Sequence, residues 1–226
     1  TYINLVNTTD AYKAVKVRVL ESMNSQEVLD FNLYLSPQDH WSAVITLSSS
    51  GTGAASLRSA DNSCTVPLAV SQGAEVDFRP FLYAADSVNG LPRTREGYIE
   101  VIEMGEVEIG SQDWPLDIEH VDGVPGDCAD LDTSWAAGGV WNGDSTDGIT
   151  AAAGGLYGYG VLIDVAEGTN ATYDALAIEE YYDAIVTQFH SDPGNTLPSL
   201  AQAQLTYNVL DGNTVVTGNA AVGRGI

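Results

Sequence analysis

The residues with the clearest capacity for chemistry are oxygen-bearing side chains in two loop-like stretches of the second half of the chain. One group surrounds Cys128, and the other lies in the loop at residues 142–148. Carboxylate and amide oxygens at this density are the ligands that Ca²⁺ prefers. The EF-hand pattern is not met, because Thr146 and Ala153 stand where two acidic ligands would fall. The sequence therefore predicts either a bound calcium ion at one of these loops, or capping and turn roles alone, for Asp122, Asp127, Asp130, Asp132, Asn142, Asp144 and Asp147.

The two cysteines, Cys64 and Cys128, both lie among loop-forming residues. Neither has a CxxC partner or a nearby histidine at ligand spacing, so a zinc site is not indicated. Two alternatives stay open, a Cys64–Cys128 disulfide or two buried free thiols. A disulfide would close a loop of about 64 residues, would stabilise the fold by about 4 kcal/mol in the chain-entropy model, and would imply an oxidising compartment.

The sequence does not contain the short motifs that mark common classes of enzyme. The sequence contains no GxSxG elbow, no HExxH and no P-loop, and no cue joins His40, His120 and His190. Two carboxylates across a cleft would suffice for a glycosidase, although with 31 acidic residues such pairs arise by chance. Whether the chain is an enzyme stays open, and the patterns favour a protein without catalysis. The pairs considered are Glu100 with Glu103, and Glu179 and Glu180 with Asp183.

Three tryptophans, Trp114, Trp135 and Trp141, allow two interpretations. They could form a platform on which a sugar ring stacks, because an indole presents a flat apolar face. They could equally fill a core, which is the more frequent role of tryptophan in β-sandwiches. The first interpretation would suit a glycan-binding domain, and the second has no bearing on function.

The elements that must position these residues are predicted to be strands. Apolar residues alternate over residues 27–35 and again over residues 41–47, on either side of a turn at residues 36–39. This pattern predicts a hairpin with one buried face and one wet face, so a second layer must cover the apolar side. We therefore expect an all-β fold, an antiparallel two-sheet β-sandwich of Ig-like or jelly-roll-like type with one or two short helices in long loops.

The same alternation and turn signals predict further strands along the chain. Residues 2–6 and 15–19 suggest an amino-terminal hairpin, and the strand beginning at residue 97 breaks its alternation in a way that a bulge near Gly105 would explain. Asp127 is expected to cap a short helix at residues 128–135. Residues 172–188 are ambiguous between strand and helix. Other expected elements are an edge strand at 76–83, a strand at 156–165, one or two helical turns at 198–204, and a hairpin of 205–210 with 214–217.

Residues 1–226 are expected to form one β-sandwich domain, or two tightly packed β subdomains with a boundary near residues 110–125. The charge is strongly negative, since 31 acidic side chains face 8 basic ones and give a formal net charge of −23. Residues 96–223 contain no lysine or arginine at all. Such a surface argues against nucleic acid and anionic membranes as partners, because the Lys and Arg contacts that they need are missing. No apolar run reaches the roughly 20 residues of a membrane helix, so no membrane span is expected.

The sequence strings at residues 2–10, 14–20, 27–37, 60–67, 93–105 and 127–135 resemble those of a family of uncharacterised exported proteins of Gram-negative bacteria. These strings cover most of the sequence, and they are specific as strings but carry no chemistry. The resemblance implies an exported β-rich protein of which this chain is a fragment, and it brings no activity and no site residue.

Two functions of different classes follow from these observations. The first is an extracellular or cell-surface structural module that self-associates into a filament or surface layer, with subunits linked by β-strand addition. The second is a secreted carbohydrate-binding or glycan-hydrolysing domain, for which glycans would be the partner. Calcium is the one cofactor that either interpretation suggests.

Overall fold

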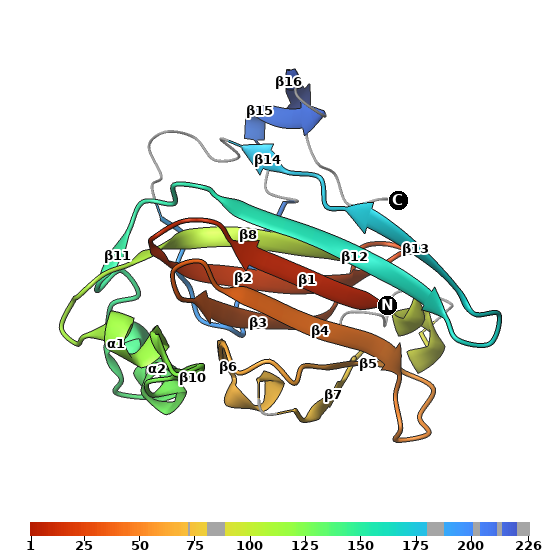
Figure 1. Ribbon diagram of the computed structural model, residues 1–226, viewed down its shortest axis with the longest axis horizontal. Helices are drawn as coiled ribbons and strands as arrows, with labels where there is room; N and C mark the ends of the chain where they lie inside the picture. Colours follow the sequence, from red (N-terminus) through yellow and green to blue (C-terminus); the bar gives the residue numbers. More distant parts are fainter. Residues whose placement is uncertain (72, 81–88, 180–187, 201–203, 212–213, 221–226) are drawn as a thin grey trace.

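The computed structural model describes residues 1–226 except residues 72, 81–88, 180–187, 201–203, 212–213 and 221–226, and beyond residue 200 it describes only the backbone of two strands (Figure 1). Two large antiparallel sheets pack face to face. The structure thus confirms the predicted all-β sandwich. None of the described helices is long and apolar enough to cross a membrane.

The six-stranded sheet, called sheet A, has the strand order β13-β12-β1-β4-β5-β7. It consists of β1 (Tyr2–Asn7), β4 (His40–Leu47), β5 (Ala55–Arg58), β7 (Glu75–Asp77), β12 (Leu156–Asp164) and β13 (Thr169–Asp174). The five-stranded sheet, called sheet B, has the order β11-β8-β2-β3-β6. It consists of β2 (Tyr12–Glu21), β3 (Glu27–Leu35), β6 (Cys64–Val66), β8 (Gly97–Val107) and β11 (Ile149–Thr150).

The remaining elements are short or lie outside the two large sheets. A small ribbon pairs β9 (His120–Val121) with β10 (Val124–Pro125), and a three-stranded sheet joins β14 (Ile178–Glu179), β15 (Gln204–Asp211) and β16 (Thr214–Ala220). The β15–β16 pairing confirms the expected last hairpin. The helices are α1 (Trp114–Ile118), α2 (Cys128–Trp135) and α3 (Val140–Gly143), with 3₁₀ turns η1 (Leu68–Val70) and η3 (Leu91–Arg95).

The predicted hairpins at the start of the chain are wrong in their pairing. β3 pairs with β2 and β6 in sheet B, whereas β4 pairs with β1 and β5 in sheet A, so the turn at residues 36–39 carries the chain between sheets. β1 and β2 likewise belong to different sheets. Buried Asn7 ties these two crossings together, because its Nδ2 donates to the carbonyls of Ala11 (2.7 Å) and Ser36 (2.8 Å). Alternation reveals which side chains face a core, but it does not reveal which strands share hydrogen bonds.

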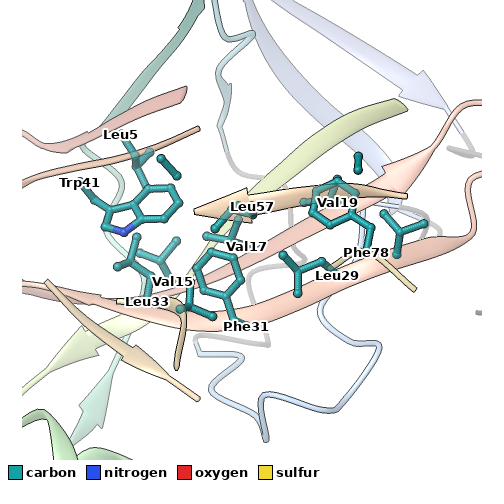
Figure 2. Close-up of a cluster of buried hydrophobic side chains, with 14 of the residues drawn as sticks. Leu5, Val15, Val17, Val19, Leu29, Phe31, Leu33, Trp41, Leu57 and Phe78 are labelled. Carbon is teal, nitrogen blue, oxygen red and sulfur yellow. The ribbon is translucent and has the colours of Figure 1, made fainter. Parts of the chain in front are cut away.

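The core between the sheets contains the apolar residues that the alternation selected over 27–35 and 41–45 (Figure 2). Leu47, expected on the same face, is 61% exposed at the end of β4. Phe31 and Leu33 of sheet B are fully buried, and Trp41 of sheet A is 1% exposed. The opposite face of β3, expected to be wet, is also buried, since Asn32 and Tyr34 are 0% exposed. That expectation is wrong because a further layer covers the outer face of sheet B.

Two local predictions are confirmed. The register between β2 and β8 shifts where Ala14 faces Gly105 and Val15 faces Glu103, which is the bulge expected near Gly105. A Cβ atom on Gly105 would lie 2.6 Å from the Thr150 carbonyl oxygen of β11, so the close approach of that strand requires glycine. β7 lies at the edge of sheet A as predicted, although it ends at Asp77, ahead of Pro80.

The extra layer on sheet B consists of two segments. We call the first the helical cap, residues 114–147, which contains α1, α2 and α3. We call the second the strap, residues 188–200, which bonds to β2, β3 and β8. The boundary suggested near residues 110–125 falls on α1, whose Trp114 and Ile118 are buried against sheet B residues. Of the other uncertain stretches, residues 172–174 are strand, while residues 180–187 and 201–203 lie outside the described part of the chain.

Candidate functional site

The helical cap is bound covalently to sheet B. A disulfide joins Cys64 of β6 to Cys128, the first residue of α2, with the two Cα atoms 5.1 Å apart. This confirms the disulfide rather than the free thiols. Asp127 caps α2 as predicted, because its side chain accepts a hydrogen bond from the Ala129 N–H at 3.0 Å. The disulfide therefore fixes the middle of the cap to the edge strand β6 of sheet B.

The residues predicted to bind calcium have local roles in the structure. Asp144 accepts hydrogen bonds from the N–H and Oγ1 of Thr146, and Asp147 accepts bonds from the N–H and hydroxyl of Ser111. Asp122 lies in the β9–β10 turn with a φ of 54°. Within the described part of the chain, no group of three His, Cys, Asp or Glu side chains is placed to hold a metal ion. Calcium binding, also for Asp130, Asp132 and Asn142, stays a prediction from the sequence.

An acidic cluster in the cap was not predicted as such. Burial is the largest cause that raises the pKa of Asp117 in α1 to about 6, and the neighbouring carboxylates of Asp130, Asp127 and Asp113 also contribute to this rise. The like charges of these three carboxylates repel that of Asp117, and residues 96–223 contain no lysine or arginine. The cluster is a site of electrostatic strain in the cap.

The tryptophans form a buried group between the cap and sheet B. Trp114, Trp135 and Trp141 are 0%, 7% and 1% exposed, and the Trp114 and Trp141 ring centroids are 4.3 Å apart. Tyr34 of β3 stacks on Trp141 at 5.4 Å, and Trp135 Nε1 donates to the Tyr34 hydroxyl at 3.0 Å. These rings fill a core, so they offer no open face on which a sugar could stack.

The strap is fastened to the same buried group by His190. The Tyr34 hydroxyl lies 2.8 Å from His190 Nε2, and His190 Nδ1 lies 2.7 Å from the Ser145 carbonyl oxygen. A carbonyl can only accept, so Nδ1 carries the proton and Nε2 accepts from the tyrosine. Burial lowers the pKa of His190 to about 4, so the imidazole is neutral in the fold. Elsewhere the strap accepts hydrogen bonds from Asn32 Nδ2 at the Ser191 carbonyl and from Lys16 Nζ at the Pro193 carbonyl.

Beside the tryptophans, the covered face of sheet B is ionic. Lys16 Nζ lies 2.7 Å from Asp30 Oδ2, and Arg18 binds both Glu27 (2.8 Å) and Glu100 (2.7 Å). Burial lowers the pKa of Lys16 although Asp30 acts in the opposite direction. These ion pairs join β2 to β3 and β8 within sheet B, so each buried cation is matched by a carboxylate of a neighbouring strand.

Glu100 and Glu103, one of the carboxylate pairs considered for a glycosidase, bind different cations in the structure. Glu100 binds Arg18, whereas Glu103 accepts a bond from Lys13 Nζ at 2.8 Å. Each of the two carboxylates therefore pairs with a different buried cation, which it shares with another glutamate. The second pair, Glu179 and Glu180 with Asp183, involves side chains outside the described part of the chain.

One serine and one histidine do meet, at the turn between the sheets. Ser36 Oγ lies 3.0 Å from His120 Nδ1, and Asp39 Oδ2 lies 3.8 Å from that same nitrogen. A hydrolytic triad needs the hydroxyl and the carboxylate on opposite ring nitrogens, so this arrangement lacks the required geometry. The other histidines lie apart, with His40 bonded to Asn4 and His190 of the strap bonded to Tyr34.

The edge strand β13 differs from everything described so far because all six of its residues are exposed. It pairs with β12 on one side and is the last strand of sheet A. Ala175 N–H donates to the Gly158 carbonyl in the same register, which fixes the alternation of backbone groups along the strand. The N–H and C=O groups of Asn170, Thr172 and Asp174 therefore point away from β12, and no described residue pairs with them.

The hairpin of β12 and β13 also runs past the start of β1 (Figure 1). The β1–β12 register ends where Tyr2 faces Val161, and beyond it Leu162 and Ile163 are 50% and 56% exposed. Tyr173 of β13 is 48% exposed and lies over Gly160, where a Cβ atom would be 2.4 Å from its ring. A hollow of about 280 Å³ lies at this overhang, lined by Thr1, Leu162, Ile163, Asp164, Thr169, Asn170 and Ala171.

The sequence contains only weak signals that this edge is exposed and apolar. Three apolar residues, Leu162, Ile163 and Val165, end a predicted strand, and Asn170 to Asp174 contain one charge in a chain of −23. A comparison of the chain with protein-family models, with curated proteins and with solved structures finds no match. The exposed edge is therefore the candidate site on physical grounds alone, because open backbone groups beside exposed apolar side chains are what a partner strand requires.

Proposed function

We propose that this chain is an extracellular or cell-surface structural module, and that its copies associate by adding a strand at the β13 edge of sheet A. The observation that carries the proposal is the exposed β13 backbone, whose outward N–H and C=O groups lie beside exposed Leu162 and Tyr173. Strand addition supplies hydrogen bonds from the main chain and buries such side chains at the same time.

The way that natural edges are protected supports this choice. An edge strand is usually blocked by lysine, proline, a bulge or a covering segment. β13 has the sequence Thr-Asn-Ala-Thr-Tyr-Asp, which contains neither lysine nor proline, and its pairing with β12 runs without a register shift. The strand lacks the features that prevent association.

The remaining properties suit a location outside the cell. The disulfide needs an oxidising compartment to form and persist. The charge of −23 keeps dispersed copies apart at low ionic strength, so association should strengthen as salt screens it.

Sedimentation velocity across a range of protein and salt concentrations tests the proposal. Thr172→Lys places a charge at the centre of the edge, and Gln112→Lys makes the same charge change in an exposed loop. We expect the wild type and Gln112→Lys to associate reversibly, more strongly with salt, and Thr172→Lys to stay monomeric. A wild-type protein that stays monomeric at high concentration and high salt would overturn the proposal, as would equal association of both variants.

A further inference from the structure

We infer that the strand added at β13 is the β13 strand of a second copy, paired antiparallel about a twofold axis through Thr172. This inference rests on the proposed association and names its partner and register. A twofold contact is isologous, so the same residues serve both sides. β13 must then be complementary to an antiparallel copy of itself. The sequence of the strand allows this requirement to be checked residue by residue.

The backbone selects the register. Only Asn170, Thr172 and Asp174 present N–H and C=O groups to a new neighbour. When Thr172 faces its own copy, Asn170 faces Asp174 of the second chain, and every outward backbone group of β13 meets a partner. A shift by two residues in either direction leaves one end of the strand unpaired. The centred register is therefore the one that satisfies the whole edge.

The side chains agree with that register. Asn170 meets Asp174, so an amide donor faces a carboxylate, and the two Asp174 side chains lie four residues apart, about 13 Å, which exceeds the Debye length at physiological salt. Asp174 Oδ1 already accepts a bond from the Tyr157 hydroxyl at 2.9 Å, which leaves Oδ2 for the amide. On the other face Ala171 meets Tyr173, a small residue beside a large one.

The apolar overhang gains most from this pairing. Tyr173 and Leu162 lie on the face of sheet A that also carries the core residue Leu5, because residues opposite one another in neighbouring strands share a face. In this antiparallel register Ala171 faces Tyr173 of the second copy, so Leu162 and Ala171 of one copy lie in one row with Tyr173 of the other, while the two hairpin tips point to opposite ends of the contact. The two sheets of six strands form one continuous sheet of twelve strands. A twofold contact uses up this edge, so it closes a dimer, and a filament would need a second contact elsewhere.

Cysteine cross-linking tests the register. The Cα atoms of a hydrogen-bonded antiparallel pair lie about 5.5 Å apart, within the range that a disulfide spans. Under mild oxidation Thr172→Cys should form a covalent dimer, Asn170→Cys alone should not, and a mixture of Asn170→Cys with Asp174→Cys should form the mixed dimer. Peptide mapping of each variant checks that the Cys64–Cys128 disulfide is intact.

The outcomes separate the two proposals. Cross-linking of Asn170→Cys to itself, or failure of Thr172→Cys in a protein that sediments as a dimer, would overturn the twofold register while leaving strand addition in place. A protein that remains monomeric in sedimentation, with no cross-link in any variant, would overturn the proposed function itself.

Discussion

The outer face of sheet B is covered in this fold, whereas the β13 edge of sheet A is exposed. The face of sheet B is covered by the helical cap and the strap, which leave Asn32, Tyr34 and Lys16 fully buried. The edge of sheet A carries no such cover among the described residues, and β13 is exposed along its whole length. Segments far apart in the sequence thus cover the outer face of sheet B, whereas the β13 edge of sheet A stays open.

The difference teaches how to distinguish a structural feature from a candidate site. Polar groups on sheet B are paired within the chain, as Tyr34 is with His190 and Trp135. Buried polar groups that are paired in this way contribute to the stability of one molecule. The outward backbone groups of Asn170, Thr172 and Asp174 have no such partner in the described part of the chain, so they are available to another molecule. Damage to the first region should affect folding, and damage to the second should affect association.

Removal of the disulfide should produce the largest effect on the covered face. The double variant Cys64→Ser with Cys128→Ser releases a loop spanning 64 residues in sequence, and the chain-entropy model gives a loss of about 4 kcal/mol. Urea unfolding followed by tryptophan fluorescence measures the loss, because Trp114, Trp135 and Trp141 lie beneath the cap. An unchanged midpoint would show that the cap is held without its covalent anchor.

Acid should weaken the strap next. His190 has a folded pKa of about 4, below the roughly 6.5 of an unfolded histidine, so the unfolded chain takes up a proton first as the pH falls. The stability due to neutral His190 is complete above pH 6.5 and is lost between about pH 6.5 and 4, by about 3 kcal/mol. Urea unfolding at pH 7 and pH 5 should show a smaller pH-dependent loss in His190→Gln than in the wild type. Equal losses would contradict the assignment.

Asp117→Asn should stabilise the cap slightly. The raised pKa of about 6 means that ionised Asp117 is disfavoured at pH 7 by burial and by the carboxylates of Asp130, Asp127 and Asp113. Because the group is partly exposed and solvent screens these charges, we expect a gain of about 0.5 kcal/mol at pH 7. The gain should shrink below pH 6, where the wild-type carboxyl is protonated in the fold. Thermal unfolding of both proteins at pH 7 and pH 5 measures it, and a loss of stability at pH 7 would contradict the account.

The smallest effect on folding is expected at the open edge. Thr172→Lys should change the free energy of unfolding of the monomer by less than about 0.5 kcal/mol, because Thr172 is exposed. Urea unfolding at low protein concentration measures this change. A loss of several kcal/mol would show that the edge is part of the fold, and it would remove the contrast between the two regions.

Much of the sandwich could be predicted from the sequence, because period-two alternation indicates which side chains face the core between the sheets. Phe31, Leu33 and Trp41 were correctly placed in a core. The helix cap at Asp127 and the bulge near Gly105 were also predicted correctly, and the disulfide was one of the two alternatives for the cysteines. Strand pairing could not be predicted, since a turn such as residues 36–39 serves equally for a hairpin or for a crossing between sheets.

The covered face and the candidate site escaped prediction for related reasons. His190 reaches Tyr34 across 156 residues, and no local pattern encodes such a contact. The tryptophans therefore left both a sugar platform and a core open until their burial was known. β13 lies in a stretch whose sequence does not distinguish a paired strand from an open edge, because the difference depends on what the rest of the chain covers.

Residue-resolved amide exchange by NMR, at low and high protein concentration, tests the central claim most directly. The amides of Ala171 and Tyr173 bond to β12 and should exchange slowly at both concentrations. The amides of Asn170, Thr172 and Asp174 should exchange rapidly in dilute protein and become protected as the concentration rises. Alternate residues of one strand would then report the arrival of a partner strand. If the exchange of Thr172 were independent of concentration while the protein associates, the contact would lie elsewhere and the account would be contradicted.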